Sequence, residues 1–327
     1  MHSRSLRAAA VAALVLAAGA ARAEELAVGN YGVSANGMPF AVALEKGYFK
    51  EEGLNITGII TSAGGGTSLR NMLAGNVPYG EVNPGVVINA IQQGADLKIV
   101  SDNALTVAEF AWVVLPGSSI KTVKDLKGKK IGYTNPRSTS QALAQMVAEY
   151  GGFKPDEVEL VRTGGFGEGV AALDAGRIDV APLTEPLWSK YKDKYRIIVT
   201  ASEALPPLDN VVGVVTAEKA KERADFIKAV IRARRKAVRF MKEHPDEAGD
   251  LVAKAYNIEP AVARSSVRNL TTSVTKGVPY WGEGEIHMDG LKRMVEVQRG
   301  LGTIKGEVDY SKIIDTSFLP DDLKALR

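Results

Sequence analysis

A repeated alternation along the first half of the chain is the feature that most restricts its fold. From Glu25 to about Pro186, short apolar runs are followed by turn residues and then by amphipathic stretches with helical spacing. This alternation is typical of an α/β fold with a mostly parallel sheet. We expect strands at 26–28, 54–60, 98–100, 111–115, 130–133, 157–161 and 180–182. Helices are expected to begin near Pro39, Thr67, Pro84, Thr122, Ser138 and Gly167.

The pattern changes after Val215. Apolar residues recur at helical spacing from Phe226 to Met241, which predicts one long amphipathic helix. A cluster of basic residues lies on the same stretch: Arg232, Arg234, Arg235, Lys236 and Arg239. Acidic residues flank them and no aromatic residue is interleaved before Phe240, so we interpret them as a solvated helix face rather than a nucleic-acid-binding patch.

Two segments of the first half are similar to each other. Residues 64–75 and 164–176 each contain a glycine-rich loop, a helical stretch and an Ala-Gly stop, and each is followed by an apolar run and a proline-containing loop. Any α/β unit can show this pattern. The alternative interpretation is a pair of similar lobes that face each other.

The N-terminal residues have the features of a secretory signal peptide. Arg4 and Arg7 precede an apolar stretch at 8–21, and Ala21-Arg22-Ala23 forms a small-x-small cleavage site ahead of Glu24. The apolar stretch is too short to span a bilayer, which needs about 20 residues. We therefore expect residues 1–23 to be removed and the remaining chain to be periplasmic.

Charge and cysteine content exclude several kinds of function. The chain has 41 Lys and Arg against 38 Asp and Glu, but three of the Arg lie in residues 1–23, so the remainder is balanced. This balance gives no electrostatic reason to expect nucleic acid or an anionic membrane as a partner. The absence of cysteine excludes disulfides, thiolate metal ligands, a cysteine nucleophile and a lipid-anchored N-terminus. The length is sufficient for two domains with separate cores.

Polar loops mark the expected ligand site. In open α/β sheets, ligands bind beyond the carboxyl ends of the strands, where glycine- and proline-rich loops at 33–39, 62–68, 83–85 and 135–140 are expected to lie. Helix N-termini there offer unpaired N–H donors to a ligand. Five hydroxyl residues either cap these helices or contact the ligand: Thr67, Ser68, Ser138, Thr139 and Ser140. Arg137 is the candidate clamp for an anion, or else a surface arginine.

Two further residues are candidates for ligand contact. Glu185 follows a predicted strand and precedes Pro186, a position from which its carboxylate would accept hydrogen bonds from a ligand N–H. Trp281 lies in a short aromatic segment between Pro279 and Gly282, where it would either stack on a ligand ring or pack in the core.

The sequence shows no catalytic or metal-binding pattern. His2 belongs to the N-terminal leader, and His244 and His287 are isolated from each other in the sequence. There is no Gly-x-Ser-x-Gly motif and no carboxylate pair at a spacing typical of acid–base catalysis. We therefore expect a binding protein without enzymatic activity, cofactor or metal.

Three motifs occur in order along the first half: GYFKEEGL at 47–54, the glycine-rich stretch at 64–75, and VKDLKGKKIG at 123–132. Together they resemble the solute-binding proteins of ABC importers for nitrate, taurine, alkanesulfonates and thiamine pyrimidine precursors. The resemblance runs from about Glu25 to Trp188. It implies an α/β type II periplasmic-binding-protein fold, with two lobes, a ligand cleft and a two-strand hinge crossing near 104–108 and 204–209.

The resemblance also implies domain bounds and a set of pocket residues. Lobe one would comprise 24–107 and 208–327, and lobe two 108–207. The first lobe would contribute Asn36, Gly37, Met38, Thr67 and Asn83, and the second Asn135, Ser138, Thr139 and Glu185. The chain departs from the family pattern at Pro78, where an aspartate is usual.

The function that the resemblance implies is capture of a small organic ligand, of the sulfonate, carboxylate or aminopyrimidine class, by a monomer that delivers it to an ABC permease in the inner membrane. Two alternatives remain open. One is a periplasmic ligand-sensing partner of a signalling receptor. The other is an enzyme similar to the pyrimidine synthases of this fold, whose cysteine-rich iron motif is missing here.

Overall fold

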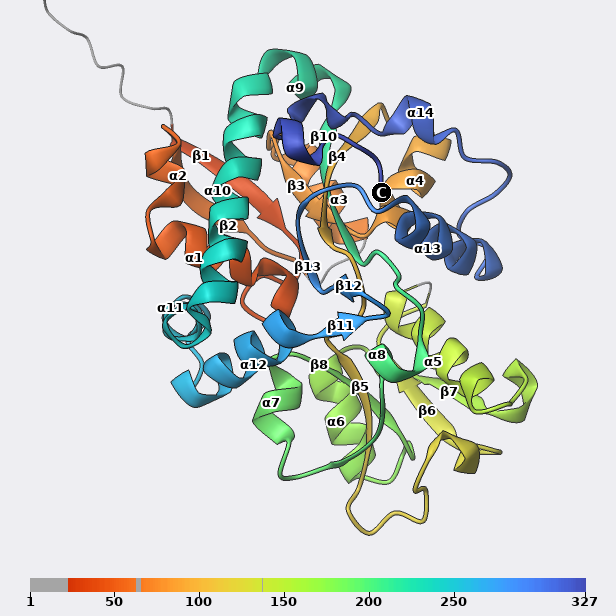
Figure 1. Cartoon of the computed structure of the whole chain (residues 1–327). Helices are drawn as coiled ribbons and strands as arrows, with labels where there is room; N and C mark the ends of the chain where they lie inside the picture. Colours follow the sequence, from red (N-terminus) through yellow and green to blue (C-terminus); the bar gives the residue numbers. More distant parts are fainter. Residues whose placement is uncertain (1–22, 63–65, 137) are drawn as a thin grey trace, which may run out of the picture.

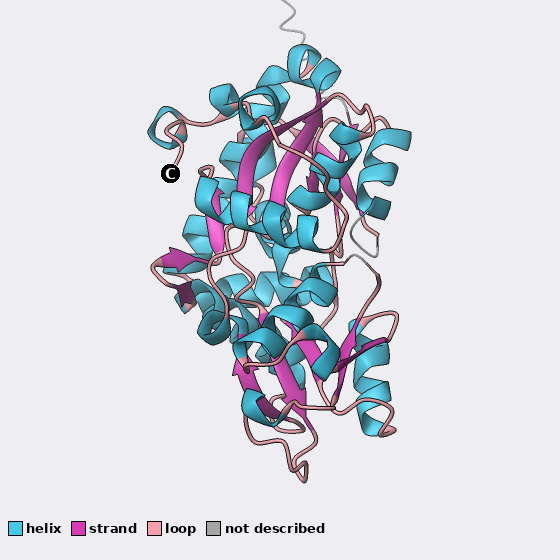
Figure 2. Ribbon diagram, turned by 90° about the vertical axis from the view of Figure 1, so that its right-hand side faces the viewer, coloured by secondary structure: helices cyan, strands magenta, loops and turns pink. Residues whose placement is uncertain are grey.

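The computed structural model describes residues 23–62, 66–136 and 138–327. Figure 1 shows two α/β halves, one above the other, and the view turned by 90° in Figure 2 shows the same division with a separate set of strands in each half. No helix in these described ranges is long and apolar enough to cross a membrane.

The upper half is built on a six-stranded sheet with the order β13-β4-β10-β3-β1-β2. Its strands are β1 (Ala23–Val28), β2 (Asn55–Ile60), β3 (Gly80–Val82), β4 (Leu97–Ala104), β10 (Val211–Thr216) and β13 (Trp281–Gly284). The apolar residues of these strands pack against helices in one large core, which includes Leu26, Ile99 and Val214.

The lower half contains two smaller groups of strands. One is a three-stranded sheet in the order β8-β5-β9 and the other is the pair β6-β7. The strands are β5 (Phe110–Val114), β6 (Lys130–Tyr133), β7 (Glu159–Arg162), β8 (Ala181–Thr184) and β9 (Arg196–Thr200). A separate core around Trp112, Leu143 and Val180 holds this half together, and a short hairpin of β11 (Val274–Thr275) and β12 (Val278–Pro279) lies between the halves (Figure 1).

Helices cover both halves. Those of the upper half and the waist are α1 (Met38–Glu45), α2 (Tyr48–Glu51), α3 (Gly66–Ala74), α4 (Pro84–Gln92), α9 (Ala217–Glu222), α10 (Ala224–Glu243), α11 (Pro245–Tyr256), α12 (Pro260–Thr272), α13 (Met288–Gly300) and α14 (Tyr310–Ile313). Those of the lower half are α5 (Thr139–Tyr150), α6 (Phe166–Asp174), α7 (Leu187–Tyr191) and α8 (Ala201–Ala204).

The chain crosses between the halves twice in its central region. It leaves the upper sheet after β4, reaches β5 at Phe110, and returns after α8 to enter β10 at Val211. The two crossing segments lie side by side, because the backbone N–H of Asn210 donates to the carbonyl of Ala104 at 2.8 Å. These positions agree with the hinge that the resemblance implied.

The expectation of a mostly parallel sheet is wrong. β1 pairs in parallel with β2 and β3, and β6 with β7, but β10 is antiparallel to both β3 and β4, and β5 is antiparallel to both β8 and β9. The reason is the double crossing. The strands by which the chain enters each half, β5 and β10, run in the opposite direction to their neighbours in the sheet. The helix expected to begin near Thr122 is a single 3₁₀ turn at Val123–Asp125, with Thr122 as its N-cap.

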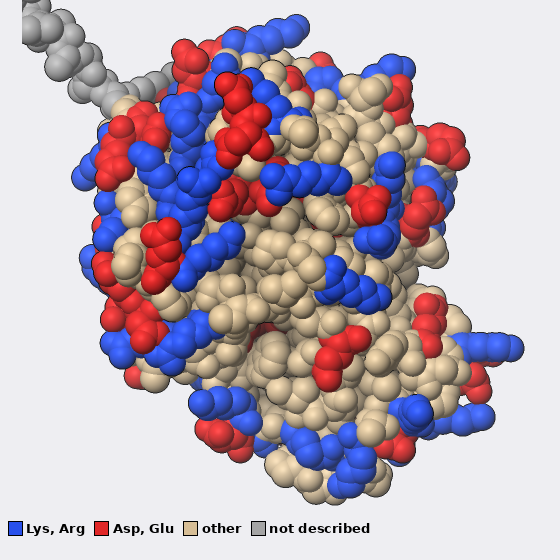
Figure 3. Space-filling model, in the orientation of Figure 1, with Lys and Arg blue, Asp and Glu red and all other residues tan. Residues whose placement is uncertain are grey.

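The prediction of a long amphipathic helix after Val215 is confirmed by α10. Its apolar side is buried, with Ile227 and Val238 fully inaccessible. Its basic side is solvated and its charges alternate with acidic neighbours, as Figure 3 shows on this face. Arg234 is the exception, since it is 2% exposed and its guanidinium donates to the carbonyls of Gly282 and Asn103 at 2.7 and 2.6 Å.

The two similar segments of the sequence occupy corresponding places in the two halves. The first contains α3, which is followed by β3 and Asn83, and the second contains α6, which is followed by β8 and Glu185. The similarity therefore reflects two α/β units of the same local design, one in each half.

Candidate functional site

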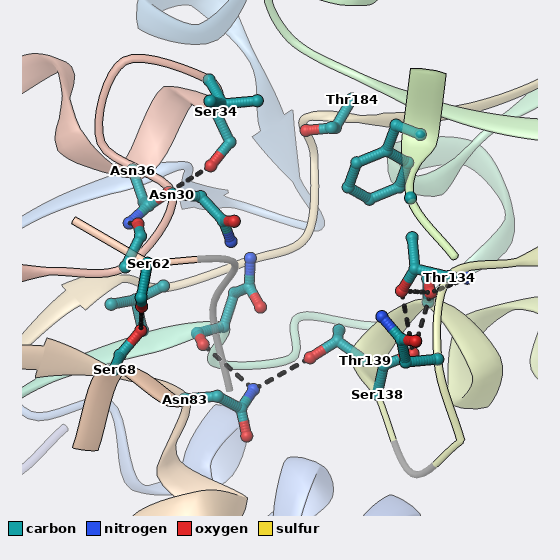
Figure 4. Close-up of a pocket in the computed structure, with 18 of the residues that line it drawn as sticks. Asn30, Ser34, Asn36, Ser62, Ser68, Asn83, Thr134, Ser138, Thr139 and Thr184 are labelled. Atoms are coloured by element: carbon teal, nitrogen blue, oxygen red, sulfur yellow. Dashed lines mark hydrogen bonds between the residues drawn. The ribbon is translucent and has the colours of Figure 1, made fainter. Parts of the chain in front are cut away.

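A cleft of about 530 Å³ lies between the two halves. Its walls are formed by loops at the ends of β1, β2, β3, β6, β7 and β8, together with both crossing segments. Figure 4 shows upper-half side chains on one side of the cleft and lower-half side chains on the other. This position agrees with the general rule that α/β folds bind ligands beyond the strand ends.

A hydrogen-bonded set of small polar side chains forms the upper wall. The hydroxyl of Ser34 donates to the side-chain carbonyl of Asn36 at 2.7 Å, and the amide of Asn36 donates to the Gly29 carbonyl at 3.0 Å. The hydroxyls of Ser62 and Ser68 lie 2.6 Å apart. These mutual contacts hold the wall in place before any ligand arrives.

The lower wall contains the N-terminus of α5. Ser138 is the N-cap residue of this helix, and its hydroxyl accepts from the backbone N–H of Gln141 at 3.2 Å. The Thr134 hydroxyl lies 2.8 Å from that of Ser140. The side chain of Asn135 donates to the Gly164 carbonyl at 3.0 Å and so ties this loop to the one before α6.

One side-chain contact joins the two walls directly. The amide of Asn83, the N-cap residue of α4, donates to the hydroxyl of Thr139 at 3.1 Å and to the carbonyl of Asn210 at 3.1 Å (Figure 4). Asn83 therefore connects the upper half, the lower half and the returning crossing segment at one point.

Two buried carboxyl groups lie on the wall of the cleft. Glu81 is 1% exposed, and its Oε1 lies 3.7 Å from Nε of Arg234 while its Oε2 accepts from Asn36 at 3.3 Å. Burial raises the pKa of Glu81 to about 7, although Arg234 acts in the opposite direction. Glu109 is 3% exposed, and burial raises its pKa to about 8. A carboxylate loses its hydration when it is buried, so burial destabilises the charged form relative to the protonated form and raises the pKa.

Aromatic rings add an apolar surface to the same cleft. Phe110 and Phe166 meet edge to face with ring centroids 5.8 Å apart, and both line the cavity. Tyr31 lines it from the upper half and packs edge to face on Tyr256. The described lining residues include Glu81, Glu109 and Glu168 but no Lys, Arg or His.

The structure brings five of the predicted pocket residues together on the cleft. They are Asn36, Asn83, Asn135, Ser138 and Thr139. For Ser138 and Asn83, helix capping and exposure to the cleft occur together rather than as alternatives.

Three predicted residues lie near the cleft without lining it. Gly37 faces Tyr256, whose hydroxyl would lie 2.7 Å from an added Cβ. Met38 is fully buried at the start of α1. The hydroxyl of Thr67 accepts from Arg70 at 2.9 Å, and the residue after it, Ser68, is the one that reaches the cavity.

Glu185 requires a correction, because its carboxylate is held away from the described cleft lining. It is fully buried and accepts from the backbone N–H and the hydroxyl of Ser189 at 3.1 and 2.9 Å, from the hydroxyl of Ser266 at 2.9 Å and from the amide of Asn269 at 2.8 Å. Since Ser266 and Asn269 belong to α12, Glu185 attaches the lower half to that helix.

For Trp281 the structure agrees with core packing, the second of the two alternatives, and not with ligand stacking. It is the first residue of β13, it pairs with Ala104 of β4, and it is 2% exposed. Its ring packs edge to face on Tyr280 at 5.1 Å, so core packing is its role in this structure. Arg137 lies outside the described residues.

Several lining residues were missed by the sequence interpretation, above all Glu109, Phe110, Phe166 and Asn210. A signal for Glu109 was available: it is the one charged residue between Asp102 and Lys121 in an otherwise apolar and small-residue stretch. Charged residues are rarely buried without a partner, so a single charge within an apolar stretch is an informative position.

Comparison with known proteins places the chain in a family. The model of the NMT1/THI5-like family matches residues 34–248. A Bacillus subtilis (strain 168) protein, named for binding aliphatic sulfonates, is 24% identical over 302 residues, which cover 90% of this chain and 87% of that protein.

Two solved structures show the same fold. The periplasmic aliphatic sulphonate binding protein SsuA from Escherichia coli has a TM-score of 0.73 at 17% identity, over 89% of this chain and 91% of SsuA. The periplasmic nitrate-binding protein NrtA from Synechocystis PCC 6803 has a TM-score of 0.71 at 13% identity, over 91% of this chain and 87% of NrtA. The expected periplasmic-binding-protein fold is thereby confirmed. Since the family model matches well over half of its residues, the chain belongs to the NMT1/THI5-like family.

Proposed function

We propose that this protein is the periplasmic solute-binding component of an ABC importer. It captures a small organic ligand of the sulfonate, carboxylate or aminopyrimidine class between two lobes and delivers it to a membrane permease, without chemical turnover. The lobes are 24–107 with 208–327, and 108–207, after removal of a signal peptide at 1–23. The chain acts as a monomer.

The observation that carries this proposal is the cleft itself. Its lining comes from both halves and both crossing segments, so closure of the halves would surround a ligand and separate it from water. A volume of about 530 Å³ lies in the range of small-molecule sites. The ligand-contacting residues we propose from the original set are Asn36, Asn83, Asn135, Ser138 and Thr139.

Supporting evidence comes from the family. The Bacillus subtilis relative is named for aliphatic sulfonates, and the solved structures are named as periplasmic binding proteins for sulphonate and nitrate. A ligand that binds only the closed arrangement shifts the equilibrium toward it, and a permease that recognises the closed form then selects loaded protein.

The test is a ligand screen on the purified chain from Glu24 onward. Thermal shift against taurine, ethanesulfonate, nitrate, benzoate and aminopyrimidines, followed by calorimetry, should give one class that raises the melting temperature in a concentration-dependent way. A matched variant with Asn83 and Asn135 changed to Leu should lose that response while remaining folded. A chain that responds to no member of the panel would contradict the proposal.

A further inference from the structure

The side-chain amides on the wall of the cleft differ in how the fold uses them. Those of Asn36, Asn83 and Asn135 each donate a hydrogen bond to a backbone carbonyl, at 3.0 to 3.1 Å. The amide of Asn210 donates to the carboxyl group of Glu109. These four amides therefore have partners within the protein.

Gln298, near the end of α13, lines the same cleft with an amide that has no such partner. The residue is 2% exposed, and its side chain makes no hydrogen bond with any described residue. Neither its nitrogen nor its oxygen is among the unpaired atoms of the described residues that are sealed from the surface. The small surface that Gln298 retains therefore includes its amide, and it lies on the cleft.

The packing of α13 on α4 holds Gln298 in this position (Figure 1). Val295 of α13 and Ile88 of α4 are buried in one apolar cluster. The side chain of Gln298 crosses the first turn of α4 at Gly85, where an added methyl group would lie 2.5 Å from Cγ and 3.1 Å from Cδ of Gln298. Glycine within a helix costs stability relative to alanine. The missing side chain at Gly85 has a structural reason, because it leaves room for Gln298.

A buried amide in this place needs a hydrogen-bonding partner once the cleft closes. Buried polar groups in proteins are nearly always paired, and closure of a site around its ligand expels water. Since no described residue pairs with the amide of Gln298, the partner must come from the ligand. A ligand without a matching group leaves a buried donor and acceptor unpaired and binds more weakly.

The chemistry of the amide indicates which ligand group matches it. Glutamine offers N–H donors and a carbonyl acceptor side by side. A carboxamide or a lactam presents the complementary pair, whereas a ketone can use only the donor. The amide carries no net charge, so it does not offset the hydration that an ion would lose beside it. The matching group is therefore neutral.

We propose that Gln298 is a specificity-determining residue of the cleft, and that its amide pairs with a neutral donor–acceptor group of the ligand, a carboxamide or a lactam. Gly85 is the positioning residue that lets Gln298 reach the cleft. This inference rests on the proposed function, because it takes the cleft to be a ligand site. It adds a recognised group to the ligand and makes no choice among sulfonates, carboxylates and aminopyrimidines.

The test compares two ring compounds that differ in one group. Benzamide carries a carboxamide, and acetophenone carries a methyl ketone of nearly the same shape. In titrations of the chain from Glu24 onward, followed by ¹H–¹⁵N NMR, benzamide should bind at least tenfold more tightly than acetophenone. It should also shift the side-chain NH₂ signal of Gln298, which is assigned by its loss in Gln298→Met.

The variant Gln298→Met keeps the length of the side chain and removes the amide. Its affinities for benzamide and acetophenone should differ by less than threefold, since the group that distinguishes them is gone. Gln145→Met is the matched control, because the amide of Gln145 donates to Glu149 on the same helix, away from the cleft lining. This control should keep the full preference for benzamide.

A second pair of variants tests the passage at Gly85. Gly85→Ala should displace Gln298 and lower the preference for benzamide as Gln298→Ala does. In the Gln298→Ala background, Gly85→Ala should have no further effect, because the Cγ and Cδ atoms that the methyl group would meet are absent. Circular dichroism checks that each variant is folded. If Gly85→Ala does not fold, the Gln298→Met comparison decides.

The outcomes separate this inference from the proposed function. Equal binding of the two compounds, a Gln298 signal that does not move with benzamide, or a preference that survives in Gln298→Met would overturn the role of Gln298 and leave the solute-binding function standing. Failure of benzamide to bind, when a member of the sulfonate, nitrate, benzoate and aminopyrimidine panel does bind, would do the same. No binding of either ring compound or of any panel member would overturn both.

Discussion

Asn83 and Thr139 join the two halves of the molecule across the cleft. Nδ2 of Asn83 lies 3.1 Å from Oγ1 of Thr139, and each residue also belongs to the start of a helix, Asn83 as the N-cap of α4 and Thr139 as the first residue of α5. The contact therefore fixes the distance between two helix N-termini that point to the same cavity.

Removal of this contact should open the cleft without unfolding either half. Thr139→Val deletes the acceptor but leaves the bond from Asn83 to the Asn210 carbonyl intact. Loss of one neutral hydrogen bond costs about 0.5–1.5 kcal/mol, so the ligand-free chain should populate a more open form. We expect a larger radius of gyration in small-angle X-ray scattering. Thr134→Val, which removes a contact inside the lower half, is the control.

An unchanged scattering profile for Thr139→Val, or an equal expansion in Thr134→Val, would show that the contact has no part in closure.

Glu185 should act on stability rather than on ligand choice. Its buried carboxylate accepts hydrogen bonds from Ser189, Ser266 and Asn269, and hydrogen bonds to a charged group contribute about 1.5–3 kcal/mol each. Glu185→Ala should therefore lower the free energy of unfolding by about 3 kcal/mol or more, measured by urea denaturation with circular dichroism. The exposed Glu243→Ala should stay within about 0.5 kcal/mol of wild type.

A Glu185→Gln variant distinguishes the stability role of Glu185 from ligand contact. A Glu185→Gln variant with wild-type stability and altered ligand preference would restore the original prediction that this residue contacts the ligand. A Glu185→Gln variant with unchanged ligand preference and a lower free energy of unfolding would support the role of Glu185 in attaching the lower half to α12.

Arg234 and Arg232 lie on the same helix, but their replacement should have very different effects on the free energy of unfolding. Arg234 is buried, lies 3.7 Å from Glu81 and donates to two backbone carbonyls, so Arg234→Leu leaves an unpaired buried acid at a cost of about 3–5 kcal/mol. Arg232 forms an exposed ion pair with Glu52, and Arg232→Leu should cost less than about 1 kcal/mol. Thermal unfolding monitored by circular dichroism compares the two, and similar melting temperatures would refute the assignment of Arg234 to the core.

Stability should fall as the pH rises from about 5 to 8. Burial raises the pKa of Glu109 to about 8 and those of Glu81 and Asp102 to about 7. Above the ordinary carboxyl pKa the unfolded chain has lost these protons while the folded chain keeps them, so the folded state binds more protons and stability decreases with pH. The loss ends once the pH has passed the raised values.

The measurement for this prediction is the free energy of unfolding in urea at pH 5, 6, 7 and 8. Glu109→Gln should flatten the decrease by at least about 1 kcal/mol, since each unit of pKa shift is about 1.4 kcal/mol. Asp125 and Asp174, whose pKa values are lowered by hydrogen bonds, titrate below this range and do not contribute. A profile that is flat in the wild type would mean that these buried acids are not protonated in the folded protein.

The sequence by itself determined the local elements. The apolar alternation predicted β6 with the bounds it has, and the periodicity from Phe226 to Met241 predicted α10 with its buried side. Ser138 was correctly placed as a helix cap, because capping depends on a few consecutive residues. These features follow from spacing within one element.

Only the tertiary structure decided which polar groups face the cleft. Glu185 and Glu109 are both buried acids beside strand ends, yet the first accepts hydrogen bonds from α12 and the second accepts one from Asn210 on the returning crossing segment. Trp281 is buried because β13 joins β4 from a distant part of the chain. The physical reason is that satisfaction of a buried charge depends on groups brought to it by the double crossing, and no local periodicity records which groups those are.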